Sequence, residues 1–242
     1  MTFEEHAVLV TGGGSGIGRA IALRFAASGA KVAVTGRRAA PLEAVARELG
    51  DRGIAVRGDV SQPGESARII DEVTTALGGL DVLVNNAGVY PLGPLAEASD
   101  DDLWAAFSTN VIAPMALIRD ALPALRKSGG VVVNIGSTVA RISKANMAAY
   151  SSSKFALEQA TRSLAVELGP LGIRVNCVAP GMTSTDMIAH LNSKVRQQYL
   201  DATPLGRMGE PDDVARVVLA VASDDCAWVT GQVIQCSGGF QL

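Results

Sequence analysis

The sequence has 242 residues, of which 48% are hydrophobic and 19% charged, a composition typical of a globular protein with a large core. Its 21 basic and 24 acidic residues give a net charge of −3 and are scattered along the chain, which argues against a nucleic-acid partner. No apolar run approaches the roughly 20 residues that cross a bilayer, and the acidic start does not resemble a secretory signal, so we expect a cytoplasmic protein without a membrane partner.

The residue types that bind metals are sparse. The three cysteines, Cys177, Cys226 and Cys236, lack C-x-x-C spacing and lie among apolar or small residues, so we expect buried thiols. His6 and His190 belong to no cluster of ligands. The sequence therefore predicts no metal site.

Short apolar runs alternate with helix-length segments along the chain. Seven strands are predicted, at Ala7–Thr11, Lys31–Thr35, Ile54–Arg57, Leu80–Asn85, Val131–Ile135, Ile173–Val178 and Gln232–Gln235. Helices are predicted at Ile17–Ser28, Pro41–Leu49, Glu65–Leu77, Asp101–Leu125, Ala149–Leu168 and Pro211–Ala222. Continuous apolar strands and repeated β-α-β order predict a parallel, doubly wound α/β sheet of the Rossmann type, with helices on both faces.

No linker or shift in composition divides the chain. We therefore expect a single domain over residues 1–242, with a cofactor half at 1–130 and a catalytic and substrate half at 131–242. The long segment Gly181–Pro204 follows the sixth strand, and it is polar and weakly helical in its second half. Since ligands bind at the carboxyl ends of such strands, this segment is predicted to close over a substrate.

A glycine-rich turn joins the first strand to the first helix, with the sequence TGGGSGIG over residues 11–18. Glycines in this setting let the backbone approach a diphosphate that lies at a helix N-terminus. A merely flexible loop is the alternative. The residues expected at the cofactor are Gly12, Gly14, Ser15, Gly16, Ile17 and Gly18.

Two arginines, Arg37 and Arg38, follow the second strand, where an acidic residue would hold the ribose hydroxyls of NAD. Guanidinium groups pair with phosphate through charge-assisted hydrogen bonds, so NADP(H) is preferred over NAD(H). The alternative is that both are solvated charges. Their place at a helix start, where the helix dipole disfavours positive charge, favours a ligand role.

Tyr150 and Lys154 lie four residues apart in a predicted helix and share one face. Carbonyl reduction needs a proton donor aligned with the oxygen, and a nearby ammonium favours the phenolate of a tyrosine. In isolation, the pair is an ordinary contact on a surface helix. The neighbouring motifs reverse that interpretation.

Asn85-Asn86-Ala87-Gly88 follows the fourth strand. The glycine turn, this motif and Tyr150-x-x-x-Lys154 occur in one order that resembles the short-chain dehydrogenase/reductase family along the whole chain. Thr185-Asp186-Met187 and Pro204-x-Gly206-Arg207-Met208-Gly209 make it most similar to 3-oxoacyl-acyl-carrier-protein reductases. The resemblance implies an NADP(H)-dependent oxidoreductase that moves a hydride between nicotinamide and a ketone or secondary alcohol.

The resemblance also implies roles for individual residues. Ser137, after the fifth strand, matches the serine that binds the substrate oxygen, and Asn110 matches an asparagine that helps to hold a water beside the lysine. The implied catalytic set is Asn110, Ser137, Tyr150 and Lys154. Further implied cofactor contacts are Asp59 and Val60 at adenine, Asn86, Ala87 and Gly88 along the ribose, Tyr150 and Lys154, and Pro180, Gly181, Thr183 and Thr185 at the nicotinamide and phosphates.

The implied mechanism is transfer of the pro-S hydride to a ketone held by Ser137 and Tyr150. Tyr150 donates the proton, Lys154 lowers its pKa, and the proton returns through the water at Asn110. Run backward, the same residues would oxidise an alcohol. The family also implies a homotetramer that pairs the helices carrying Asn110 and Lys154.

The substrate stays open between a 3-oxoacyl thioester, a free ketone and a secondary-metabolite intermediate. The similar reductases bind the acidic carrier through two arginines, where this chain has Ser128 and Leu171. Arg126 and Lys127 could compensate, so an acyl-carrier partner is left undecided. The residues expected to face the substrate are Tyr90, Thr138 to Met147, with Arg141 and Lys144 suited to an anionic substrate, and the 181–204 segment. A non-catalytic NADP(H) sensor is the alternative class of function, and a plain structural domain would leave the glycine turn and the arginines unexplained.

Overall fold

A computed structural model describes residues 2–188 and 192–240. Seven parallel strands form one sheet in the order β3-β2-β1-β4-β5-β6-β7. This is the predicted doubly wound arrangement in a single domain. The strands are β1 (Ala7–Thr11), β2 (Lys31–Gly36), β3 (Gly53–Arg57), β4 (Val82–Asn85), β5 (Val131–Ile135), β6 (Arg174–Pro180) and β7 (Val233–Cys236).

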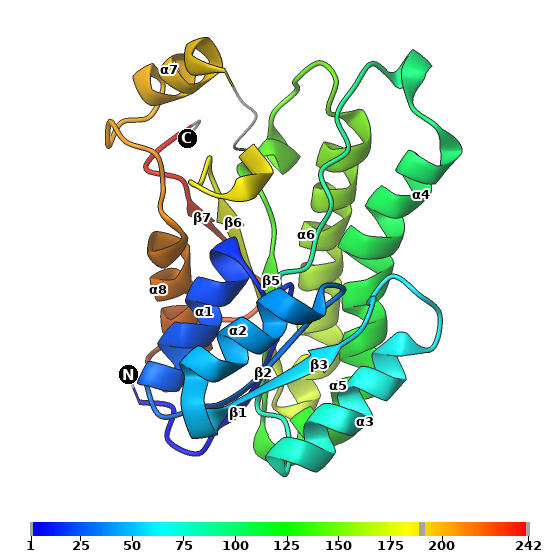
Figure 1. Ribbon diagram of the computed structural model, residues 1–242, viewed down its shortest axis with the longest axis vertical. Helices are drawn as coiled ribbons and strands as arrows, with labels where there is room; N and C mark the ends of the chain where they lie inside the picture. The colour runs from blue at the N-terminus through cyan, green and yellow to red at the C-terminus, as the bar shows by residue number, and fades with distance from the viewer. Residues whose placement is uncertain (1, 189–191, 241–242) are drawn as a thin grey trace.

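Helices cover both faces of the sheet (Figure 1). The first seven are α1 (Gly16–Ala27), α2 (Ala39–Leu49), α3 (Glu65–Leu77), α4 (Asp100–Phe107), α5 (Ala113–Ser128), α6 (Ala148–Leu168) and α7 (Ser193–Asp201), and α8 is Pro211–Ala222. Strand side chains alternate between two buried clusters: Val8 and Val10 pack with α1, α2 and α8, whereas Leu9 packs with α3, α5 and α6. This two-sided burial explains the continuous apolar strands.

The prediction of one continuous helix over Asp101–Leu125 is wrong in the middle of that range. The structure has two helices, α4 and α5, separated by a π-helical turn at Ser108–Ile112 (η3). Asn110 lies in this turn, is wholly buried, and exchanges hydrogen bonds with the backbone of Val89. Such turns often occur where a helix must aim one side chain at a functional site.

The sheet order reverses between β1 and β4, which pair directly although one follows the other by some 70 positions. Their loops diverge at this point and leave a crevice at the carboxyl edge, the usual ligand site of open α/β sheets. The segment after β6, which contains η6 (Asp186–Ile188) and α7, lies above the same edge (Figure 1). Residues 189–191 of the predicted closing segment lie outside the described residues.

Arg174, at the start of β6, binds the end of α8. Its guanidinium donates to the carbonyl oxygens of Val221, Ala222 and Ser223 at 2.8, 3.0 and 3.1 Å, and to Val229 at 3.3 Å. The last carbonyls of a helix have no partner within the helix, so a cation there both caps and stabilises it. Partial burial lowers the pKa of Arg174, but a guanidinium stays charged.

We expect Arg174→Met to lower the free energy of unfolding by about 2–4 kcal/mol, because several buried carbonyls lose charged donors. Urea unfolding followed by circular dichroism measures this loss. Arg216→Met is the matched control, since Arg216 is a largely exposed arginine of α8 that pairs with Asp212. An equal loss in both variants would show that capping by Arg174 contributes no more to the free energy of unfolding than the exposed ion pair of Arg216.

Candidate active site

The glycine turn is locked to the loop after β4. The Thr11 hydroxyl accepts hydrogen bonds from the backbone N–H groups of Asn86 and Ala87, both at 2.9 Å, and the Asn86 amide donates to the Thr11 carbonyl at 2.9 Å. Gly12 has φ +62°, and a Cβ on Gly18 would lie 2.3 Å from the Gly12 carbonyl oxygen. Two glycines are thus required for the backbone to fold this tightly.

One cavity of about 690 Å³ contains most of the predicted site. Of the predicted residues, those lining it are Gly12, Gly14, Ser15, Gly16, Ile17, Arg37, Arg38, Asp59, Val60, Asn86, Ala87, Gly88, Ser137, Tyr150, Lys154, Pro180, Gly181, Thr183 and Thr185. Gly18 and Asn110 do not line it. Gly18 packs behind the turn, and Asn110 is buried beneath the wall.

The cofactor end of the cavity is electropositive. Arg37 and Arg38 are exposed, and neither forms an ion pair within residues 2–188 and 192–240. Arg38 donates to the Ser15 hydroxyl at 3.4 Å, and Arg57, which does not line the cavity, donates to the Arg37 carbonyl at 3.2 Å. Helix α1 begins beside them without an acidic residue in its first turn. These donors fit an anionic, phosphate-bearing cofactor.

Asp59, which follows β3, also lines the cavity. One of its carboxylate oxygens accepts from the backbone N–H of Ser61 at 3.1 Å and from the Ser61 hydroxyl at 2.7 Å. No hydrogen bond to its second oxygen is formed by the described residues. That oxygen therefore has capacity to accept from an amine, as an adenine contact requires.

Ser137, Tyr150 and Lys154 meet at the centre of the cavity. The Ser137 side chain lies close enough to Tyr150 to favour its phenolate, and the Lys154 ammonium lies 5.9 Å from the centre of the Tyr150 ring. Lys154 donates to the Ile135 carbonyl at 2.8 Å. The Tyr90 ring meets the Tyr150 ring edge-on, with centroids 4.5 Å apart, so Tyr90 forms the wall beside the reacting phenol.

Asn110 supports this centre from behind. Its amide nitrogen donates to the Val89 carbonyl and the Ser153 hydroxyl, both at 3.0 Å, and its oxygen accepts from the Val89 N–H at 2.9 Å. These bonds use the side chain to tie the π turn to α6 and to the loop after β4. A water at Asn110 stays a prediction.

Burial controls both ionisable groups. It raises the pKa of Tyr150 to about 12; the Ser137 side chain partly opposes this rise and Tyr90 reinforces it. It lowers the pKa of Lys154 to about 8. The lowering of the Tyr150 pKa by Lys154 stays a prediction: here the ammonium donates to the Ile135 carbonyl, and desolvation of the phenol sets the direction of the shift.

These pKa values predict how reduction depends on pH. A phenol with a raised pKa keeps its proton at neutral pH, whereas a lysine with a lowered pKa loses its charge at a pH well below the usual range. We expect kcat for ketone reduction to fall as the pH rises through about 8, where Lys154 deprotonates. Lys154→Arg should move this fall to higher pH, since arginine stays charged. A reduction profile that is flat from neutral to strongly alkaline pH would contradict the assignment.

The chain end and α7 complete the substrate side. The Tyr199 hydroxyl accepts from the Met182 N–H at 2.6 Å, and the Tyr199 and Phe240 rings pack with centroids 4.3 Å apart. Both residues line the cavity and were missed from the sequence, because nothing in the pattern shows that α7 and the chain end meet. Tyr90, Met147 and Ile188 contribute further apolar wall.

Two basic residues predicted to face the substrate have different environments. Lys144 lines the cavity and forms no ion pair with any described residue. Arg141 does not line it. Its guanidinium donates to Glu158 at 2.9 Å, because a wholly buried carboxylate attracts it away from the cavity. The prediction for Arg141 is therefore wrong.

The predicted buried state of the cysteines holds for one of three. Cys177 is buried, whereas Cys226 and Cys236 are partly exposed, and all three are free thiols. Cys226 and Cys236 lie near the chain end, where β7 is an edge strand with partly exposed residues. Within the parts that the structure describes, no helix is long and apolar enough to cross a membrane.

A parallel sheet with a glycine turn at its crevice, a basic phosphate end and a Ser-Tyr-Lys centre defines a nicotinamide-dependent oxidoreductase. The family model described as enoyl-(acyl carrier protein) reductase matches residues 12–241. The chain belongs to the short-chain dehydrogenase/reductase family.

Two curated relatives are similar along their whole length. The chain is 38% identical to the (2S)-[(R)-hydroxy(phenyl)methyl]succinyl-CoA dehydrogenase subunit BbsD of Thauera aromatica, covering 100% of this chain and 99% of the relative. It is 34% identical to the 3-oxoacyl-[acyl-carrier-protein] reductase FabG of Escherichia coli, covering 100% of both.

Solved structures agree closely with the fold. A short-chain dehydrogenase from Burkholderia cenocepacia in complex with NADP has a TM-score of 0.94 at 37% identity, covering 100% of both chains. A 7α-hydroxysteroid dehydrogenase complexed with NADH has a TM-score of 0.95 at 34% identity, covering 99% of this chain and 95% of that one. Relatives with this fold therefore bind either nicotinamide cofactor.

Proposed function

We propose that this enzyme is an NADP(H)-dependent reductase of ketones, or in reverse a dehydrogenase of secondary alcohols, with a 3-oxoacyl thioester as the first candidate substrate. The observation that carries the proposal is the joining of Ser137, Tyr150 and Lys154 to the glycine turn and two unpaired arginines in one cavity. A plain binding protein has no need of a protonated phenol at the centre of that cavity.

The residues have separable tasks in this reaction. Bound NADPH supplies the hydride. Ser137 and Tyr150 hold the substrate oxygen, and the Tyr150 hydroxyl donates its proton as negative charge develops there. Lys154 stabilises that charge as an ammonium, and burial of the centre strengthens this interaction.

The preference for NADP(H) is supported by charge. A 2′-phosphate adds a dianion that two unpaired guanidinium groups at the end of β2 can bind through parallel hydrogen bonds. An acidic residue there would repel it. We therefore propose Arg37 and Arg38 as the groups that select NADP(H) over NAD(H).

A thioester substrate is supported by the names of the two relatives, one of which acts on a CoA thioester and the other on a carrier-bound one. The substrate wall is apolar around Tyr90, Ile142 and Phe240, and Lys144 adds a cation to the same wall, which suits an anionic group on the substrate. A free ketone is the alternative. Recognition of an acyl-carrier protein stays undecided, because Ser128 and Leu171 replace the expected arginines.

The test is the loss of NADPH absorbance with acetoacetyl-CoA and, in parallel, with a set of free apolar ketones. Turnover of the thioester with NADPH, and much slower turnover with NADH, is the expected result. Turnover of free ketones but not of acetoacetyl-CoA would show that the substrate is a free ketone rather than a thioester. Tight NADPH binding with no turnover of either class would overturn the enzymatic proposal in favour of a cofactor sensor.

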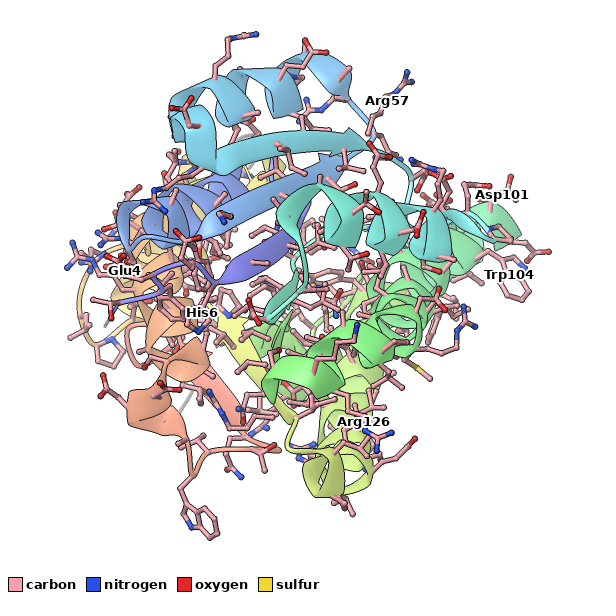
Figure 2. The ribbon with its side chains drawn as sticks, turned by 90° about the horizontal axis from the view of Figure 1, so that it is seen from below. Glu4, His6, Arg57, Asp101, Trp104 and Arg126 are labelled. Atoms are coloured by element: carbon pink, nitrogen blue, oxygen red, sulfur yellow. The ribbon has the colours of Figure 1, made fainter. Side chains whose placement is uncertain are left out.

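We also propose a homotetramer, which buries exposed apolar side chains on the helices that carry Asn110 and Lys154. Trp104 projects outward from α4 and is 68% exposed (Figure 2). Phe155 and Val166 on α6 are 52% and 80% exposed. Such residues on paired helices are typical of subunit interfaces, and the molar mass from light scattering tests this. Cytoplasmic localisation stays a prediction.

A further inference from the structure

A buried carboxylate lies one turn beyond Lys154 on α6. Tyr150, Lys154 and Glu158 follow one another at four-residue spacing, and all three are buried. The Glu158 side chain is 0% exposed. One of its oxygens accepts from Arg141, while the other has no hydrogen-bond partner among the described residues. Because an incompletely bonded buried charge is costly, core packing alone does not account for it.

Arg141 connects this carboxylate to the reacting serine. It ends the short 3-10 turn Thr138–Arg141 (η4), which begins directly after Ser137. Within that turn, the Ala140 N–H donates to the Ser137 carbonyl at 3.1 Å. The Arg141–Glu158 bond of 2.9 Å therefore fastens the Ser137 turn to the helix that carries Tyr150.

The other cation near Glu158 cannot make this connection. Arg162 lies 3.9 Å from the carboxylate, beyond hydrogen-bond distance, and belongs to α6 itself. Arg162 can therefore only link α6 to itself. Arg141 is the arginine that joins two elements.

The residue before Ser137 is closely packed against β6. A Cβ on Gly136, the residue before Ser137, would lie 2.7 Å from the Cys177 sulfur. Burial and then the Glu158 charge raise the pKa of Cys177 to about 12, so the thiol stays neutral. The Ser137 turn, β6 and Glu158 on α6 therefore lie close to one another, with Cys177 between them.

We propose that Arg141 and Glu158 are a positioning pair, which sets the separation of the Ser137 and Tyr150 hydroxyls for the chemical step. The inference rests on the proposed ketone reduction. Neither residue lines the cavity, so their effect must pass through Ser137 and Tyr150. A misplacement on the order of 1 Å at such a centre lowers rates by up to about 100-fold.

The test compares Glu158→Gln, Arg141→Met, the double variant and Arg141→Lys. We expect each of the first two to lower kcat by about 10- to 100-fold, with the KM for NADPH unchanged. The double variant should be no slower than the slower single variant, because both remove one interaction. Arg141→Lys should recover part of the loss, since an ammonium can also donate to the carboxylate.

A matched control is Arg24→Met, which breaks an arginine–carboxylate pair between α1 and α8, away from the cavity. It should lower Tm without changing kcat. Unchanged kcat in Glu158→Gln and Arg141→Met would overturn the proposal. It would also be overturned if kcat, NADPH affinity and Tm fell together, as a merely structural role requires.

Hydrogen exchange separates this test from the proposed function, because it needs no substrate. Peptides that span residues 137–142 should exchange faster in Arg141→Met than in the unsubstituted protein, while Arg24→Met leaves them unchanged. If the unsubstituted protein reduces no ketone, the proposed function fails, and exchange still decides whether the pair fastens the serine turn. Equal exchange in all variants would show that the Arg141–Glu158 bond does not hold the Ser137 turn in place.

Discussion

Tyr150→Phe is expected to lower kcat by about 100- to 10,000-fold, the usual contribution of a general acid. The substitution removes one hydroxyl and keeps the ring, so the edge-on contact with Tyr90 and the shape of the cavity remain. The phenol is nearly buried and keeps its proton at neutral pH, as a proton donor to the substrate oxygen must. Steady-state turnover measures the loss.

The Kd for NADPH should stay within about twofold in this variant, since the phosphate end is untouched, and a fluorescence titration measures it. Ser152→Ala is the matched control, because it removes a hydroxyl from the exposed side of the same helix turn. It should keep full turnover. If Tyr150→Phe retained more than about a tenth of the turnover, Tyr150 would not be the proton donor.

Replacing the two arginines is expected to abolish the selection of NADPH over NADH. A charge-assisted hydrogen bond contributes about 1.5–3 kcal/mol, so Arg37→Gln or Arg38→Gln should each lower kcat/KM for NADPH by roughly 10- to 150-fold. Values for NADH should change by less than about twofold, since NADH carries no 2′-phosphate. Initial rates with each cofactor at a fixed substrate concentration give the ratio.

The control for charge alone is Arg19→Gln, an arginine of α1 that pairs with Glu48 and does not line the cavity. This substitution lowers the net charge by the same amount and should leave kcat/KM for both cofactors unchanged. If Arg37→Gln and Arg38→Gln lowered kcat/KM for NADPH and NADH by the same factor, the arginines would bind the diphosphate common to both cofactors or stabilise the loop. The selection of NADP(H) would then need another explanation.

Most strands could be predicted because they are apolar on both faces, as a covered parallel sheet requires. Their ends were less certain: β4 begins at Val82 rather than Leu80, and β6 runs to Pro180. The π turn at Ser108–Ile112 carries no sequence signal, since it depends on bonds from Asn110 to Val89 and Ser153. Hydrophobic spacing alone favoured an unbroken helix.

The site could be predicted where residues act through local motifs. The glycine turn and the Tyr150–Lys154 pair depend on short spacings, and the structure brings them together. Arg141 could not be placed, because its partner Glu158 lies 17 positions away and its burial is a tertiary property. The upward shift of the Tyr150 pKa likewise could not be predicted from the sequence, since desolvation depends on which walls enclose the ring.

The pairing of β1 with β4 also affects how the chain folds. Thr11 and Asn86 are separated by 75 positions, so their hydrogen bond can form only after a long loop has closed. The glycine turn, locked to the loop after β4, is therefore incomplete in any intermediate in which β1, β2 and β3 alone have paired. Since a nicotinamide cofactor binds at the complete turn, it will stabilise the fully folded chain over such partly paired states, by a free energy that rises with the logarithm of its free concentration.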